Sequence, residues 1–137
     1  MQNLLSKITD QSAEIGIIGQ GYVGLPLAMA FAKKFTVFGY DVCSGTVERL
    51  RAGKSHIQDV TGEQLSRFLG ETYHPTSNPE DLRQCDLLII CVPTPLSEDK
   101  IPDLSYIKSA CTTIRAVLHP GQFVILESTT YPGTTDE

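Results

Sequence analysis

Positive charge is scarce in this sequence and nowhere gathers into a cluster. The chain carries 11 lysines and arginines against 16 aspartates and glutamates, a net charge of −5 at pH 7. Proteins that bind nucleic acid need a basic surface, so the sequence argues against DNA or RNA as a partner. It also lacks an apolar run long enough to span a membrane and the basic-then-apolar start of a secretion signal. We therefore expect a soluble, cytoplasmic protein with no membrane partner.

Closely spaced cysteine pairs are absent as well. The chain contains four cysteines and no Cys-x-x-Cys motif, which argues against a zinc site, any other metal centre of that kind and a disulfide framework. We predict that all four are reduced thiols packed as small apolar groups. The thiol inside a buried-looking strand is not expected to be a nucleophile. The cysteines are Cys43, Cys85, Cys91 (the strand residue) and Cys111.

The length of the chain limits it to one domain. With 137 residues, 41% of them hydrophobic, it can form one substantial core and is too short for a second. Residues 1–13 are polar with a few leucines, and we interpret them as an N-terminal extension that forms a frayed helical turn on the domain surface. The domain itself is expected to cover residues 14–137.

A glycine-rich turn organises the rest of the sequence. The segment EIGIIGQGYVGLPL, which begins at Glu14, places three glycines between a β-branched run and a helical pattern. In a dinucleotide-binding turn, Gly19 allows a sharp turn out of a strand, Gly21 lets the backbone approach a pyrophosphate, and Gly24 lets helix and strand pack closely. The anion would bind the free N–H groups at the helix N-terminus.

An acidic residue follows this turn at the expected distance. The strand predicted for residues 35–40 ends at Asp41, about twenty residues beyond the glycines, where a carboxylate would accept hydrogen bonds from the adenosine ribose. The alternative is that Asp41 is an ordinary loop aspartate at the end of a strand. This interpretation must also explain why strand, turn, helix and strand occur in this order. A 2′-phosphate would meet like charge at Asp41, so the sequence predicts NAD rather than NADP.

Strands and helices are predicted to alternate along the chain, which indicates a Rossmann-type, doubly wound parallel sheet with helices on both faces, in three layers. The nearly all-apolar strand at 86–92 should lie beside the first strand. The complete fold has six strands, so a chain with five is interpreted as truncated before the last one, with a reading frame that continues past Glu137. Strands are expected at 15–18, 35–40, 73–76, 86–92 and 122–126, and helices at 25–32, 46–52, 61–69, 79–84 and 103–118.

Four segments are expected on one rim of this sheet, because ligands bind beyond the carboxyl ends of the strands where the strand order reverses. The turn at 19–24 and Asp41 would hold the pyrophosphate and adenosine. The loops at 92–95 and 127–130 would flank the nicotinamide.

No proton acceptor or nucleophile for a redox reaction can be identified on this rim. The three histidines, His56, His74 and His119, fall in loops or at element ends, and we interpret each as a surface residue away from the rim. The substrate pocket is therefore expected to lie outside this chain.

With these residues assembled, the sequence resembles the NAD-binding N-terminal domain of the nucleotide-sugar 6-dehydrogenases, the UDP-glucose/GDP-mannose dehydrogenase family. The TTYPGTT and CVPTPL segments look most like the branch that oxidises UDP-N-acetylglucosamine and related UDP-N-acetylhexosamines for bacterial surface polysaccharides. The matching pieces cover nearly the whole chain: GQGYVGLPLA at 19–28, Asp41, CDLLIICVPTPL at 85–96, IPDLSYI at 101–107 and ESTTYPGTT at 127–135.

The resemblance implies a two-step, NAD-dependent oxidation of a sugar C6 alcohol to a carboxylate through an enzyme-bound thiol adduct. The main catalytic residues and the UDP-sugar site belong to segments absent here, so this piece alone is expected to be inactive, and the full-length protein is expected to be a homo-oligomer. Thr129 is the one candidate for direct participation, by positioning a water or the substrate oxygen; a hydroxyl that satisfies loop backbone is the equal alternative. The residues assigned to the cofactor are Gly19, Gln20, Gly21, Tyr22, Val23, Gly24, Asp41, Val92, Thr94, Ser128 and Thr129.

One departure and two alternatives accompany this resemblance. Several relatives carry an arginine or lysine five residues after the ribose acid, whereas this chain has Thr46, so adenosine-side affinity is weaker or is supported from elsewhere. A free-standing nucleotide-sensing module, such as those of potassium transport systems, shares the first turn but has no evident need for the prolines and hydroxyls at 93–95 and 128–130. A dehydrogenase of the 3-hydroxyisobutyrate type should have a different loop after the fourth strand.

Overall fold

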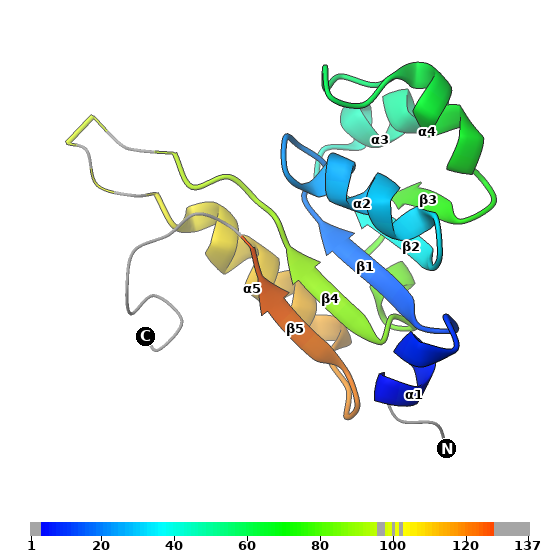
Figure 1. The fold of residues 1–137 in the computed structure, drawn as a ribbon. Helices are drawn as coiled ribbons and strands as arrows, with labels where there is room; N and C mark the ends of the chain where they lie inside the picture. Colours follow the sequence, from blue (N-terminus) through cyan, green and yellow to red (C-terminus); the bar gives the residue numbers. More distant parts are fainter. Residues whose placement is uncertain (1–3, 96–97, 100, 102, 128–137) are drawn as a thin grey trace.

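Five parallel strands form one sheet in the computed structural model, which describes residues 4–95, 98–99, 101 and 103–127 (Figure 1). The order is β3-β2-β1-β4-β5, and every neighbouring pair is parallel. The Rossmann-type sheet predicted from the sequence is confirmed, as is the position of the apolar fourth strand beside the first. The strands are β1 (Glu14–Ile18), β2 (Thr36–Tyr40), β3 (Tyr73–Thr76), β4 (Leu87–Ile90) and β5 (Phe123–Leu126).

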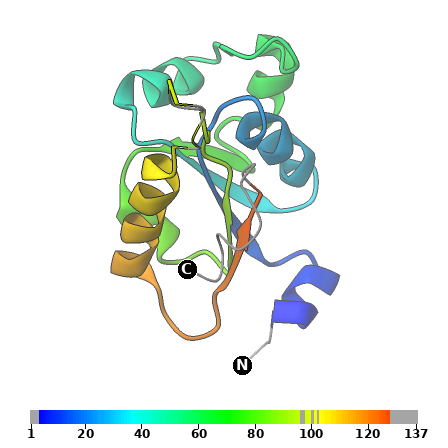
Figure 2. The same cartoon turned by 90° about the vertical axis from the view of Figure 1, so that its left-hand side faces the viewer.

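Helices cover both faces of the sheet, with α2 and α5 on opposite sides (Figure 2). One predicted helix is shorter than expected: the segment after Asn78 is a single 3-10 turn, η1, which stops at Leu82 and not near Gln84. Its predicted start is right, since Asn78 accepts the backbone N–H of Glu80 and Pro79 is the first helical residue. The helices are α1 (Leu4–Thr9), α2 (Gly24–Ala32), α3 (Ser44–Arg51), α4 (Gly62–Phe68), η1 (Pro79–Leu82) and α5 (Ser105–Val117).

The core consists of two apolar clusters, one on each face of the sheet. Ile17 of β1 belongs to the cluster under α2 and α4, whereas its neighbour Ile18 belongs to the cluster under α5 and η1. All four residues of β4 are buried, as expected of a central strand covered on both faces. The chain moves outward from β1 to β3 and then returns to β4, so the strand order reverses between β1 and β4. A ligand crevice is expected beyond the carboxyl ends of these two strands.

The N-terminal helix α1 is attached at the opposite, amino end of the sheet. None of its residues is buried, in agreement with a surface helical turn. The Lys7 Nζ lies 2.7 Å from Asp86 Oδ1, and the other oxygen of Asp86 accepts the backbone N–H of Glu14 at 2.9 Å. Residues 4–9 are therefore held away from the rim on which the site was predicted.

The same amino end generates a pH-dependent prediction. Burial, and next the charge of Asp86, raises the pKa of Glu14. If the pKa of a carboxyl is higher in the folded than in the unfolded chain, the folded state loses stability as the pH rises through the two pKa values. We expect Glu14→Gln to increase the free energy of unfolding at pH 7, by less than about 1 kcal/mol because the side chain remains partly solvated.

At about pH 3.5, where the carboxyl is protonated in both states, the gain should vanish. Thermal unfolding at the two pH values measures this difference. The exposed Glu71, changed to glutamine, provides a matched control for the loss of one negative charge from the surface. An equal stabilisation by Glu14→Gln at both pH values would contradict the assignment.

Candidate functional site

The turn between β1 and α2 contains three glycines with three different environments. Gly19 has a φ of +98°, and a Cβ there would lie 2.8 Å from the carbonyl oxygen of Cys91. At Gly24 a Cβ would lie 1.7 Å from the carbonyl oxygen of Gly19, a distance no side chain can tolerate. Near Gly21, no described atom lies within 4 Å of where a Cβ would be. Packing therefore requires the first and third glycines, whereas the second leaves the backbone open.

Asp41 is held directly against this turn. Its Oδ2 accepts the backbone N–H of Gln20 at 3.0 Å, and its Oδ1 accepts the N–H of Cys43 at 2.9 Å. The end of β2 is tied to the turn a second time, because the N–H of Gly19 donates to the carbonyl of Tyr40 at 2.8 Å. The carboxylate is thus fixed in direction, and each oxygen keeps a further lone pair for a ligand hydroxyl.

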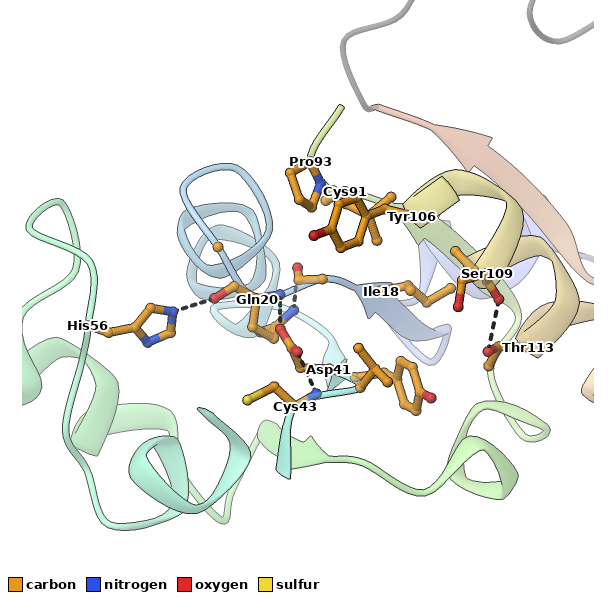
Figure 3. Close-up of a pocket in the computed structure, with 16 residues that line it drawn as sticks. Ile18, Gln20, Asp41, Cys43, His56, Cys91, Pro93, Tyr106, Ser109 and Thr113 are labelled. Carbon is orange, nitrogen blue, oxygen red and sulfur yellow. Dashed lines mark hydrogen bonds between the residues drawn. The ribbon is translucent and has the colours of Figure 1, made fainter. Parts of the chain in front are cut away.

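A cavity of about 330 Å³ opens beside the turn and Asp41 (Figure 3). We call it the Asp41 cavity. Its wall combines residues 18–21, residues 40–43 after β2, His56, residues 91–93 after β4 and one face of α5. The α5 residues are Tyr106, Ser109, Ala110 and Thr113.

A second hollow, of about 370 Å³, adjoins the first and shares Gly21 and residues 91–93 with it. Tyr22, Val23 and Thr94 complete its lining, and the first two are 78% and 52% exposed. The described residues assigned to the cofactor, Gly24 aside, are therefore brought together around two connected hollows. Neither lining includes a lysine or arginine, and Asp41 is the single acid among the lining residues.

Gln20 takes part in the site through its backbone. Its side chain is fully buried: Nε2 donates to the carbonyls of Ile17 and Gly19 at 3.1 and 3.0 Å, and Oε1 accepts the Tyr73 hydroxyl at 2.6 Å. Its backbone acts on the site by bonding Asp41 and His56, and its side chain offers no polar atom to a ligand in the Asp41 cavity. The sequence placed Gln20 in the motif correctly but did not indicate the direction of its side chain.

The expectation that His56 lies away from the rim was wrong, although the residue is exposed as predicted. This residue lines the Asp41 cavity, and its Nε2 lies 2.8 Å from the carbonyl oxygen of Gln20 because the loop between α3 and α4 folds back over the turn. The other two histidines lie outside both hollows, as expected. His74 stacks on Phe38 at a centroid distance of 5.3 Å, and the two ring nitrogens of His119 bond to backbone carbonyls.

The α5 wall was also missed from the sequence. The pattern of residues 103–118 predicted a covering helix, and four of its residues form one side of the cavity, among them the 47% exposed Tyr106. In Figure 3 the Tyr106 ring lies beside Pro93 and Cys91. In the sequence, the one signal for this wall was an aromatic residue, Tyr106, within the amphipathic pattern of the helix.

The cysteines divide into two pairs. Cys85 and Cys91 are buried as predicted, and burial raises their pKa values to about 12 and about 11. Cys43 and Cys111 are exposed, so the expectation that all four pack in the interior was wrong for these two. Cys43 follows Asp41 at the start of α3, and a hydrogen bond from the Thr46 side chain lowers its pKa.

Some predicted features lie outside the described residues, namely Ser128, Thr129 and most of the loop at 127–130. The described residues bring no three His, Cys, Asp or Glu side chains into a possible metal site. Within the same part of the chain, no helix has both the length and the apolar character to cross a membrane.

Comparison with known proteins agrees with this geometry. The model of the UDP-glucose/GDP-mannose dehydrogenase family, NAD binding domain, matches residues 13–137. The chain belongs to this family. The resemblance seen in the sequence is confirmed, and NAD is the cofactor of the matched domain. The family match decides against the regulatory module and the 3-hydroxyisobutyrate-type enzyme.

Several members of this family are similar in sequence and structure. A UDP-N-acetyl-D-glucosamine 6-dehydrogenase of Pseudomonas aeruginosa is 42% identical over 124 residues, which cover 90% of this chain and 29% of that protein. The structure of a UDP-D-ManNAc dehydrogenase of Pyrococcus horikoshii is 40% identical, with a TM-score of 0.84 over 90% of this chain and 30% of that one. A GDP-mannose dehydrogenase from Pseudomonas aeruginosa is 28% identical with the same TM-score and the same coverage. The chain thus spans about 30% of the length of these relatives.

The glycine turn generates a paired prediction. Gly24→Ala should destabilise the chain by at least roughly 3 kcal/mol, since the new methyl group would overlap the Gly19 carbonyl. Gly21→Ala should leave stability within about 0.5 kcal/mol and weaken NADH binding roughly tenfold or more, because the methyl group enters the opening above the backbone. Urea unfolding and NADH fluorescence titration separate the two effects. Full-strength NADH binding by Gly21→Ala would show that the opening is not the pyrophosphate site.

Thiol reactivity generates a second prediction. In the folded chain, Cys43 and Cys111 should react with iodoacetamide, with Cys43 the faster because its pKa is lowered. Cys85 and Cys91 should react only after unfolding. Saturating NADH should slow the reaction of Cys43, which lines the Asp41 cavity, and leave Cys111 as an internal control. Mass spectrometry of the modified peptides measures all four rates, and rapid labelling of Cys91 without denaturant would contradict the described packing.

Proposed function

We propose that this chain is the cofactor-binding part of an NAD-dependent enzyme that oxidises the C6 alcohol of a UDP-N-acetylhexosamine, or of UDP-glucose, to the uronic acid for surface polysaccharide synthesis. Similar proteins support this choice of substrate class, among them the UDP-N-acetyl-D-glucosamine 6-dehydrogenase of Salmonella typhi, 42% identical over 126 residues. The rest of the proposal depends on the Asp41 cavity and the adjoining hollow.

The observation that carries the proposal is the fixed carboxylate of Asp41. Both of its oxygens are oriented by backbone N–H groups, and the cavity that it lines has the apolar side chains expected around an adenosine. A ribose with two free hydroxyls can donate to this carboxylate. A 2′-phosphate would meet its negative charge with no lining lysine or arginine to offset it, which favours NAD over NADP.

The pyrophosphate would lie over Gly21, between the two hollows. No lysine or arginine is among the described residues that line either of them, and its charge would be met by backbone N–H groups of the turn and the start of α2, where the helix dipole favours an anion. The open space above Gly21 allows the close approach that such binding needs. The protein thus neutralises the cofactor with peptide groups in place of arginine or lysine.

The nicotinamide would occupy the second hollow, against Tyr22, Val23 and Thr94. A nicotinamide held there would supply the acceptor for a hydride from the substrate carbon. The side chains of this chain hold the ring and exclude water from one side of it. Ser128 and Thr129 are proposed to border the same ring, with Thr129 a candidate for positioning a water or the substrate oxygen.

Other parts of the proposal concern the whole protein. The UDP-sugar would be bound largely outside the part of the relatives that this chain spans, and the complete enzyme would be a cytoplasmic homo-oligomer. Within this chain, residues 1–13 would be an extension and residues 14–137 the NAD-binding domain.

Asp41→Asn tests the cofactor assignment. The change keeps the shape of the side chain but removes its charge and half of its acceptor capacity, so NADH should bind roughly tenfold more weakly. The preference for NADH over NADPH should shrink at the same time. Fluorescence titration of both cofactors with the 137-residue chain measures the two affinities.

A matched control is Asp59→Asn, an exposed aspartate outside both linings, which changes the net charge equally and should leave both affinities unaltered. If Asp41→Asn bound NADH like the unaltered chain, Asp41 would not be the ribose ligand. If the unaltered chain bound neither cofactor, the proposed function of the domain would be wrong.

A further inference from the structure

Gln20 is the most extensively bonded residue of the site, although it offers no side-chain atom to a ligand. It is 0% exposed, and both its amide group and its backbone are committed to other parts of the protein. The backbone N–H donates to Asp41 and the carbonyl oxygen lies 2.8 Å from His56 Nε2. The side chain reaches inward to Tyr73 on the edge strand β3. Segments up to 53 residues apart in sequence are therefore joined at this one position.

Which way the Gln20 amide faces is determined by two backbone carbonyls together with Tyr73. Its hydroxyl is fully buried, and burial raises the pKa of Tyr73, so the group remains a neutral donor. It donates to Oε1 at 2.6 Å, and this leaves Nε2 to donate to the two carbonyls of Ile17 and Gly19. The reversed amide would place its oxygen against both carbonyls, which is repulsive. The hydrogen-bond network therefore allows one orientation only.

Gly39 makes room for this contact in the middle of β2. A Cβ at this position would lie 2.5 Å from Gln20 Oε1 and 2.7 Å from the Tyr73 hydroxyl. A glycine inside a strand weakens the strand unless another group needs the space. Here the space is occupied by the hydrogen bond between the Tyr73 hydroxyl and Gln20 Oε1, which passes over β2 and links β3 to the cofactor turn.

The orientation of the Gln20 amide fixes the peptide groups of the turn. With the Gly19 carbonyl held inward, the N–H of the same planar peptide points to Asp41. With the Gln20 carbonyl directed at His56, the N–H of Gly21 must point the opposite way. Release of the amide would remove the inward bond of the Gly19 carbonyl, so the first of these peptide planes could rotate and carry the N–H of Gln20 away from the Asp41 carboxylate.

We propose that Gln20 is a positioning residue for the cofactor, acting from inside the core: the Tyr73 hydroxyl and the Ile17 carbonyl hold its amide, and the amide holds the Gly19 carbonyl, and with it the N–H that binds Asp41, in the geometry that binds NAD. This inference rests on the proposed function. It assigns to Tyr73, which lines neither hollow, an effect on cofactor affinity.

A double-mutant cycle on the 137-residue chain tests the proposal, with NADH affinity as the readout. Tyr73→Phe removes only the hydroxyl and should weaken NADH binding roughly threefold to tenfold, the range of one lost hydrogen bond. Gln20→Met removes the amide at similar volume and should weaken binding at least as much. The double variant should bind no more weakly than Gln20→Met alone, because the hydroxyl acts only through the amide.

Thr72→Val is the matched control. It removes a neighbouring hydroxyl that is buried with no hydrogen-bond partner among the described residues, and it should leave NADH affinity within roughly twofold. Amide NMR spectra supply a readout independent of binding. The resonances of residues 19–22 and 41–43 should shift in Tyr73→Phe and stay in place in Thr72→Val.

Three results would overturn the proposal. The first is unchanged NADH affinity in Tyr73→Phe, and the second is a double variant whose loss of NADH affinity equals the product of the two single losses. The third is that the amide resonances of the turn do not move. If circular dichroism shows that Tyr73→Phe does not fold, the test depends on Gln20→Met alone. Wild-type NADH affinity in Gln20→Met would then refute the positioning role. Absence of NADH binding by the unaltered chain refutes the proposed function instead, and the amide spectra then still test the link between Tyr73 and the turn.

Discussion

The contact between the first residue of α2 and the carbonyl of Gly19 is the constraint on which the site depends. It allows no atom beyond hydrogen on Gly24, and it places the start of the helix directly over the end of β1. Because the turn is so tight, its peptide groups have few alternative directions. Both hollows border this turn, and the opening above Gly21 lies between the two glycines that make the close approach.

The site is built with little charge. The described residues of its linings include one carboxylate and no lysine or arginine. Several relatives carry a basic residue five positions after the ribose acid, where this chain has Thr46. The structure shows what stands in that region: the Thr46 side chain bonds to Cys43, and His56 closes over the turn from another loop. Peptide dipoles and shape, more than ion pairs, must therefore supply the affinity for a charged cofactor.

Local patterns in the sequence were sufficient for the sheet and for the outline of the rim. The strands, the caps at Thr61 and Asn78 and the separate roles of the three glycines all depend on residues close together in the chain. Contacts between distant segments could not be read in this way. His56 lies 36 residues from its partner Gln20 in sequence, and no periodicity reports a loop that folds back.

Side-chain direction was the other limit of the sequence. The same pattern that placed Gln20 in the turn is compatible with an amide that faces the ligand or the core, and the choice depends on Gly39 and Tyr73 in other strands. The exposed cysteines show the same limit, since a thiol at the start of α3 and one on the outer face of α5 look no different in sequence from buried ones. The burial of Cys85 and Cys91 could be predicted because both lie next to the apolar run of β4.

The two backbone donors on Asp41 have a consequence for engineering of cofactor preference. A 2′-phosphate would be repelled by the Asp41 carboxylate, so acceptance of a phosphorylated ribose would require replacement of this acid. In this protein that replacement would also leave the N–H groups of Gln20 and Cys43 without their acceptor. A redesign must therefore supply acceptors for both N–H groups before it adds the new cation.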